Sequence, residues 1–448
     1  MSIKIKTSWT DNNAIIEGVR IYKSSSIFNV NSLPAIYAEI LDGSNSYEDF
    51  NVVDGQTYFY MLSCFLGEQE SFTECFKVDA IKEVLLWVTT SAFMSKSQQN
   101  AASNHSLSST ADRVSLGVSA SDTAKWRGGV LGPNGRIYMI PSYSSNVMII
   151  NLGNGLATRS NMGADLSGSN KWTGGCLSKT GKIYCAPTDS TDVLIINPDT
   201  NTAIRSSMGA DLSGARKWIG AVLANNGKIY CIPNNANDIL IIDPATNTAI
   251  RSSMGADLSG DGKWTGAVLA NNGKIYCIPN NATDILIIDP ATNTATRSNM
   301  GADLSGSNKW TGGVLASNGK IYCAPNNATD ILIIDPATNT AIRSSMGADL
   351  SGAGKWRGGC LGVDGKIYFI PQNSTDILII DPVANTAIRS SLGATLSGDW
   401  KWYGGVLGGD GKIYGCSYDS LNTLVISKNV SIAQPDIKYC LSPHINKF

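Results

Sequence analysis

The chain has 448 residues, enough for two or more hydrophobic cores, and its apolar content of 43% excludes a disordered polypeptide. Its formal net charge is −1 with only 16% charged residues, so no basic surface for nucleic acid is expected. No apolar run reaches the roughly 20 residues that span a bilayer, and the first residues lack the apolar core of a secretory signal. We therefore expect no nucleic-acid partner and no membrane insertion. We also expect the chain to be made in the cytosol and to stay there, unless a larger assembly carries it out.

Residues 1–80 contain no repeat and predict a small all-β domain. Short segments of alternating polarity, such as residues 18–22, 37–40 and 57–63, are separated by turn residues, a pattern typical of an antiparallel sandwich. With its early Trp9 and the run from Asp54 to Tyr58 that leads into a long strand, this region resembles a fibronectin type III domain. The resemblance implies that Tyr58 is the corner tyrosine of such a domain.

Residues 81–108 predict a linker. The apolar run 81–88 is followed by small polar residues from Ser95 to Ser106, a composition typical of flexible connectors. The boundary between two domains is expected here.

From residue 109 the sequence is dominated by a repeat with a period of 46 residues. Its marker is a tryptophan, which occurs at Trp126, Trp172, Trp218, Trp264, Trp310, Trp356 and Trp402. A period in the forties with several short strands per unit is the sequence pattern of a β-propeller. We predict a seven-bladed propeller over residues 109–427, followed by a C-terminal tail at 428–448.

Each repeat predicts four strands. The segment that begins at Lys-Trp turns back through Asn-Gly or Asp-Gly, both of whose residues we expect to be left-handed, into Lys-Ile-Tyr and a final proline. The third strand, Asp-Ile-Leu-Ile-Ile-Asp, is apolar throughout, which predicts burial on both faces. The turn Asp-Pro-Ala-Thr-Asn-Thr then leads into an outer strand. Paired small residues on the first strand, such as Gly128 and Gly129, are expected at the crowded centre of the ring.

The ring is expected to close through a strand that precedes the first tryptophan. Residues 110–117 lie in register with the outer strand at residues 202–209, whereas residues 428–436 do not resemble an outer strand. We predict that residues 109–117 complete the blade whose other strands lie at 401–427, which would leave no unpaired edge.

Cysteine, histidine and glutamate offer little chemistry within the repeats. Cysteines at one repeat position alternate with Met139 and Phe369, so we interpret them as buried hydrophobic residues, and no Cys-x-x-Cys spacing suggests a metal. Cys64 and Cys75 could lie on neighbouring strands, as a reduced pair. The two histidines, His105 and His444, and the last glutamate, Glu83, all lie outside residues 109–427. We predict no catalytic residue, no metal and no cofactor.

Repeated aspartates, lysines and arginines are interpreted as architecture. Asp243 and Asp238 represent the aspartates that end and open the third strands, and both classes are expected to bond to their own backbone. Asp165 lies six residues before Lys171, a spacing that recurs, so we expect Lys–Asp ion pairs around the ring; a ring of lysines that captures an anion at the channel mouth is the alternative. The tryptophans and seven arginines are expected to pack between blades, with tryptophans open to sugar as the alternative.

Departures from the repeat mark the candidate binding site, because a specific site needs asymmetry. They cluster near the predicted closure at Arg127, Tyr143, Arg357, Trp400, Lys401, Tyr403 and Tyr418. The aromatic side chains beside Lys401 could stack on a saccharide. The alternative that we favour is that they seal the joint against the segment before the first blade.

The repeat as a whole resembles the kelch-like and related repeats of seven-bladed propellers, over about 320 residues from Lys-Trp-x-Gly-Gly-Val-Leu to Ile-Ile-Asp-Pro-Ala-Thr-Asn-Thr. Together with the fibronectin-like region, it is similar to virion proteins of tailed bacteriophages. That resemblance implies a tail, fibre or capsid-attached structural protein, assembled in the host cytoplasm in several copies with other virion proteins. It would dock through one domain and present the other to protein or host-surface glycan. A free lectin is the alternative, and an enzyme acting on polysaccharide is a third.

Overall fold

The structure is a computed structural model that describes residues 109–117 and 124–428, together with short segments between residues 5 and 95. The chain divides into two units, residues 109–428 and the remainder. Every regular element in the described part is a β-strand. The predicted all-β class is confirmed there, and the described part contains no helix long and apolar enough to cross a membrane.

The described segments of the first unit form two antiparallel sheets. β1 (Ile5–Ser8) pairs with β4 (Ser46–Asp49), and the second sheet has the order β3-β2-β5-β6-β8, with β7 also paired to β5. Its strands are β2 (Gly18–Ser24), β3 (Ile36–Ile40), β5 (Thr57–Leu66), β6 (Gln69–Phe72), β7 (Phe76–Asp79) and β8 (Met94–Ser95). β8 falls within the segment predicted as a linker. The fibronectin-like assignment remains a prediction, and Cys75, the run 81–88 and the tail beyond residue 428 lie outside the described residues.

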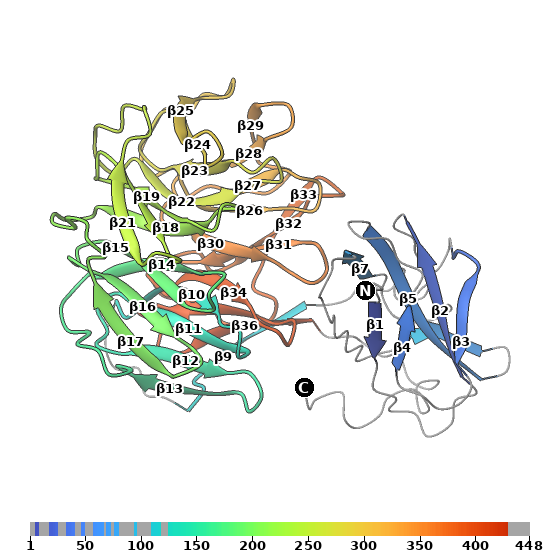
Figure 1. Ribbon diagram of the computed structural model, residues 1–448. Helices are drawn as coiled ribbons and strands as arrows, with labels where there is room; N and C mark the ends of the chain where they lie inside the picture. Colours follow the sequence, from blue (N-terminus) through green and yellow to red (C-terminus); the bar gives the residue numbers. More distant parts are fainter. Residues whose placement is uncertain are drawn as a thin grey trace. The chain divides into compact units, whose positions relative to one another are not determined.

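Residues 109–428 form seven four-stranded antiparallel sheets arranged around a common centre, as Figure 1 shows. The innermost strands are β10 (Trp126–Leu131), β14 (Trp172–Leu177), β18 (Trp218–Leu223), β22 (Trp264–Leu269), β26 (Trp310–Leu315), β30 (Trp356–Leu361) and β34 (Trp402–Leu407). The second strands are β11 (Arg136–Pro141), β15 (Ile183–Pro187), β19 (Ile229–Pro233), β23 (Ile275–Pro279), β27 (Ile321–Pro325), β31 (Ile367–Pro371) and β35 (Ile413–Ser417). The predicted seven-bladed propeller is confirmed.

The third strands are buried at almost every position, as their unbroken apolar runs predict. They are β12 (Val147–Asn151), β16 (Val193–Asn197), β20 (Ile239–Asp243), β24 (Ile285–Asp289), β28 (Ile331–Asp335), β32 (Ile377–Asp381) and β36 (Thr423–Lys428). The outer strands are β13 (Leu156–Ser160), β17 (Thr202–Ser206), β21 (Thr248–Ser252), β25 (Thr294–Ser298), β29 (Thr340–Ser344) and β33 (Thr386–Ser390). The blades are numbered 1 to 7 in chain order, from β10 to β34.

The outer strand of blade 7 comes from before blade 1. β9 (Ser109–Val114) pairs antiparallel with β36, with Ala111 opposite Ile426 and Val114 opposite Thr423. In Figure 1, β9 is cyan and its partner is red. Leu116, just beyond β9, is buried, and its carbonyl accepts a hydrogen bond from the N–H of Ala157 in blade 1. The predicted closure is therefore confirmed, and the segment links blade 7 to blade 1.

The repeated tryptophan packs between neighbouring blades, as predicted: Trp264 of blade 4 lies in one buried cluster with Tyr230 of blade 3. Trp264 is fully buried, and its indole N–H donates to the carbonyl of Asp284 at 2.9 Å. The guanidinium of Arg297 lies 5.5 Å from the centre of that indole ring and also donates to the Asp257 carbonyl. All seven tryptophans are fully buried, so the architectural interpretation is confirmed and the alternative of tryptophans open to sugar is wrong.

The repeated lysines do not form the predicted ion pairs. The ammonium of Lys309 donates to three backbone carbonyls, those of Asn280, Ala282 and Gly306, at 2.7–3.0 Å. The carboxylate of Asp165 instead lies 3.9 Å from the guanidinium of Arg205. The lysines are buried rather than arranged at a channel mouth, so that alternative is wrong as well. A lysine ammonium can donate three hydrogen bonds, so it satisfies the carbonyl groups of the loops around the start of each blade.

The aspartates divide into two structural classes. Asp243, at the end of a third strand, accepts from the backbone N–H groups of Ala245 and Thr246, as predicted. Asp238, at the start of that strand, pairs with Arg251 at 2.7 Å instead of bonding to its own backbone, so that prediction is wrong. The arginine is available because its outer strand runs beside the third strand.

The hairpin between first and second strands also differs from prediction. Of the Asn226-Gly227 pair in the hairpin of blade 3, only Gly227 is left-handed, with φ of 81°, and its N–H donates to the Ala224 carbonyl. Asn226 keeps negative φ and uses its side chain, which accepts from the Lys228 N–H and donates to the Tyr230 hydroxyl. This geometry fits a turn followed by a glycine bulge, in which one left-handed residue suffices.

The seven cysteines in residues 124–428 are all free, and each is buried or half-buried. Burial raises the pKa of the Cys176 and Cys360 thiols to about 12 and that of the Cys231 thiol further. Since the thiolate is the reactive form, we expect native protein at pH 8 to react with a water-soluble disulfide reagent at no more than the remaining three of its ten cysteines. The same assay on guanidinium-unfolded protein should reach all ten. Rapid native modification of more than three would contradict the buried placement.

Candidate functional site

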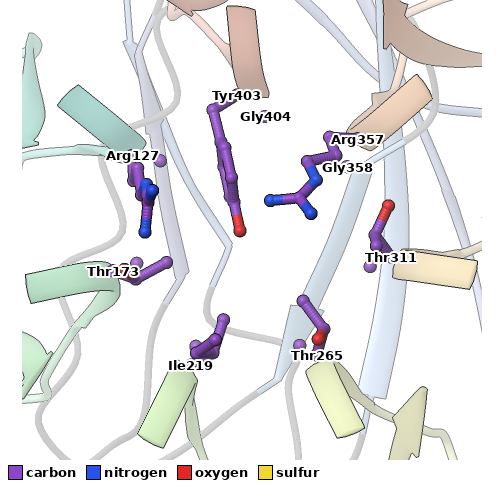
Figure 2. Close-up of a pocket in the computed structure, with 14 residues that line it drawn as sticks. Arg127, Thr173, Ile219, Thr265, Thr311, Arg357, Gly358, Tyr403 and Gly404 are labelled. Atoms are coloured by element: carbon purple, nitrogen blue, oxygen red, sulfur yellow. The ribbon is translucent and has the colours of Figure 1, made fainter. Parts of the chain in front are cut away.

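The centre of the ring is a narrow channel lined by one position from every blade. This position, directly after each tryptophan, is occupied by Arg127, Thr173, Ile219, Thr265, Thr311, Arg357 and Tyr403. Figure 2 shows these side chains converging on one central space. The next residue is always glycine, because the inner strands approach too closely for a Cβ: an atom added at Gly220 would lie 3.0 Å from the Cα of Gly266.

At one end the channel widens into a pocket of about 480 Å³, which we call the axial pocket. Its walls come from the channel position, from loops between second and third strands, and from the residues that precede the repeated lysines. Its lining consists of Arg127, Tyr143, Asn170, Thr188, Arg216, Ile219, Asn234, Asn235, Asp261, Gly262, Thr265, Asn280, Asn281, Asn308, Arg357, Trp400 and Tyr403. A volume of 300–1,000 Å³ is usual for small-ligand sites.

The two sides of the axial pocket differ in chemistry. Blades 6, 7 and 1 contribute Arg357, Trp400, Tyr403, Arg127 and Tyr143. Blades 3 and 4 contribute mainly the carboxamides Asn234, Asn235, Asn280 and Asn281. We call these the aromatic side and the amide side. The asymmetry arises because the same repeat positions carry different residues at the closure.

The aromatic side is a stack of cations and rings. The guanidinium of Arg357 lies 4.6 Å from the ring centre of Tyr403 and 5.7 Å from that of Trp400. Arg127 lies 5.4 Å from the ring centre of Tyr403 and 5.0 Å from that of Tyr418. Such contacts hold long side chains in fixed orientations.

Tyr418 supports the stack from behind without lining the axial pocket. Its hydroxyl accepts a hydrogen bond from Arg127 at 2.7 Å. Burial raises the pKa of the Tyr418 phenol, an effect that the positive charge of Arg127 opposes. At neutral pH the phenol therefore stays uncharged and leaves the charge of Arg127 unneutralised.

The structure brings six of the seven predicted binding residues together. Arg127, Tyr143, Arg357, Trp400 and Tyr403 line the axial pocket, and Tyr418 supports them. Lys401 does not line it: its side chain is buried and donates to the carbonyls of Gln372 and Gly398, and burial lowers its pKa to about 8. Its proximity in sequence to Trp400 and Tyr403 was misleading.

Within residues 109–117 and 124–428, the contacts of these aromatics do not show a seal against the preceding segment. Trp400 and Tyr403 contact Tyr418 and Arg357 at the axial end. The segment 109–117 instead bonds at the outer edge of blade 7. They do join blade 7 to blade 1 through Arg127.

Sequence reasoning missed the amide side. Asn235 and Asn281 repeat with the period, so they were not distinguished from structural residues. They also act between blades: the Asn235 side chain accepts from the N–H of Gly262, and Asn281 from that of Asn308, at 2.8 Å. A sequence signal existed in the residue that precedes each lysine, which varies among Ala, Asn, Arg, Gly and Trp while the lysine and tryptophan after it do not vary.

No family model matches this chain, and no curated protein matches it either. Solved structures that resemble it include a streptogramin B lyase, at 14% identity and TM-score 0.58 over 72% of this chain and 98% of the other. Virginiamycin B lyase from Staphylococcus aureus matches at 12% identity and TM-score 0.56, over 72% and 99%. YCF48 bound to D1 peptide matches at 10% identity and TM-score 0.54, over 73% and 97%. At these identities the likeness shows the propeller fold alone.

Proposed function

We propose that the propeller is a non-catalytic glycan-binding module and that its sugar ligand occupies the axial pocket. The observation that carries the proposal is the opposition of an aromatic side, with Trp400 and Tyr403, to an amide side. Sugars present apolar C–H faces that stack on aromatic rings and hydroxyl edges that need polar partners. Carboxamides suit such edges because each offers both donors and an acceptor.

The backbone at Trp400 supports a ligand-binding role. The residue before each repeated lysine is left-handed, and at two blades it is Gly262 or Gly354. Trp400 adopts φ of 51° there, a conformation that costs a non-glycine residue roughly 1–2 kcal/mol. Trp400 as a whole residue is also 43% exposed, so full burial does not offset that cost. Strain of this kind is found at functional sites.

The amino-acid composition of the propeller favours binding over catalysis. A virginiamycin B lyase in which a histidine is replaced by alanine is described as catalytically inactive. Residues 109–428 of this chain contain neither histidine nor glutamate. The one carboxylate in the lining of the axial pocket, Asp261, has no second carboxylate beside it in that lining for paired acid–base work.

We further propose that the chain works as a virion structural protein of a tailed bacteriophage, which docks through its first unit and presents the propeller to host glycan. This proposal draws on the resemblance between the domain order of this chain and that of virion proteins of tailed bacteriophages. Detection of the chain in purified phage particles would support it. Recovery only as free protein would favour the free lectin.

A glycan array probed with the full chain tests the binding proposal. We expect discrete glycan signals that weaken about tenfold in Trp400→Gly, because the stacking ring is lost. Asn293→Gly is the matched control, since it also places glycine at a left-handed position, with φ of 55°, but in an outer turn. No glycan bound by the wild-type chain, or equal loss in both variants, would refute the proposal.

A further inference from the structure

Two arginines face the axial pocket from either side of one tyrosine. In Figure 2 Arg127 and Arg357 flank Tyr403, the guanidinium of Arg357 is directed into the central space, and both arginines line it. They come from blades 1 and 6, the neighbours of blade 7, so the closure of the ring sets their separation. No other blade carries arginine at this position.

These two arginines lack the carboxylate partners that the outer arginines have. Arg251, for example, pairs with Asp238 at 2.7 Å. Within residues 109–117 and 124–428, no ion pair forms to Arg127 or Arg357. Arg127 donates only to neutral acceptors, the Asn170 side chain and the Tyr418 hydroxyl. The Nε atoms of Arg127 and Arg357 are both buried without a hydrogen-bond acceptor.

The junction between blades 1 and 2, beside Arg127, lacks side-chain hydrogen bonds that other junctions have. At other junctions an Asn or Asp side chain accepts the N–H of the left-handed residue in the next blade, as Asn373 does for Trp400 at 2.8 Å. In blade 1 that position is Tyr143, which lines the axial pocket and whose ring centre lies 5.9 Å from the guanidinium of Arg127. Ser142 next to it is buried with its hydroxyl unpaired, whereas the equivalent Asn234 bonds to the carbonyl of Trp264.

The axial pocket has an excess of positive charge. Three arginines line it, Arg127, Arg216 and Arg357, against the single carboxylate of Asp261 on the amide side. A concave site with excess positive charge concentrates anions. A planar guanidinium with a free N–H matches a carboxylate by paired hydrogen bonds.

We propose that the axial pocket selects acidic glycans and that Arg127 and Arg357 bind the carboxylate of a sugar acid at the hydroxyl end of Tyr403, where Figure 2 shows the central space. The sugar ring then stacks on Trp400, which is exposed, and its hydroxyls reach the amide side. This inference rests on the proposed glycan binding and adds the chemical class of the sugar.

The test compares matched acidic and neutral ligands by titration calorimetry with the full chain. Sialyllactose is paired with lactose, and a galacturonate oligosaccharide with the same oligosaccharide after reduction of its carboxyls. We expect at least one acidic member to bind about tenfold or more tightly than its neutral partner, and more weakly at high salt. Arg357→Gln should remove that preference without changing the melting temperature. Arg136→Gln, which removes an exposed arginine of the hairpin between β10 and β11, should retain it.

The other possible outcomes would contradict either the carboxylate site or glycan binding itself. Binding of neutral members as tight as that of acidic ones, or of sulfated glycans alone, would overturn carboxylate selection while leaving glycan binding intact. An acid preference that survives both Arg357→Gln and Arg127→Lys would place the anion elsewhere. Absence of binding to every glycan on the array and in these pairs would overturn the proposed function as well.

Discussion

Deletion of residues 109–117 from the full chain is expected to destabilise the propeller more than any single substitution. It removes every hydrogen bond between β9 and β36, at roughly 0.5–1.5 kcal/mol each, and exposes an unpaired strand edge. It also removes Leu116, a side chain whose burial contributes about 1.5–3 kcal/mol. Differential scanning calorimetry should show a large fall in melting temperature, and light scattering should show association of the exposed edges.

A synthetic peptide of residues 105–117 provides the rescue. Because it binds only the folded ring, excess peptide should raise the melting temperature of the deletion variant with peptide concentration. A peptide with Ala111→Glu is the control, since Ala111 is 3% exposed and a carboxylate there would be buried without a partner. A deletion variant that melts like the wild-type chain would show that the closing strand is dispensable.

Trp264→Ala is expected to lower the free energy of unfolding by about 3–5 kcal/mol, the usual range for a buried aromatic replaced by alanine. Trp264 is fully buried in one cluster with Tyr230, Ile275 and Leu286. Its loss also leaves the carbonyl of Asp284 without its donor and removes the ring beneath Arg297. Denaturant titration followed by circular dichroism measures the change.

Two comparison variants separate packing from hydrogen bonding. Trp264→Phe keeps most of the apolar volume but loses the indole N–H, so we expect a smaller loss, of about 1–3 kcal/mol. Trp400→Gly should leave stability unchanged or raise it, because the left-handed backbone there suits glycine. A cost for Trp400→Gly equal to that for Trp264→Ala would mean that the two tryptophans do not differ as the structure shows.

The sequence alone determined the architecture of the propeller. Seven copies of a 46-residue unit predicted the number of blades, and the apolar third strands predicted which strands are buried. The match of residues 110–117 to an outer strand identified the closure. These inferences succeed because one blade cannot bury both faces of its own sheet, so a repeated pattern forces repeated neighbours.

Only the tertiary structure decided what the polar residues do. Sequence spacing suggested that Lys171 pairs with Asp165, whereas the ammonium turns to the carbonyls of Ser142 and Gly168. Lys401 was expected at the binding site beside Trp400, yet neighbouring residues of a strand or its entry loop can face opposite sides, and it is buried. The axial pocket combines single residues from distant blades, such as Arg127 and Tyr403, which are 276 residues apart (403 − 127), and no local pattern records that they meet. Side-chain partners depend on distances across blades, and those distances exist only once the ring has closed.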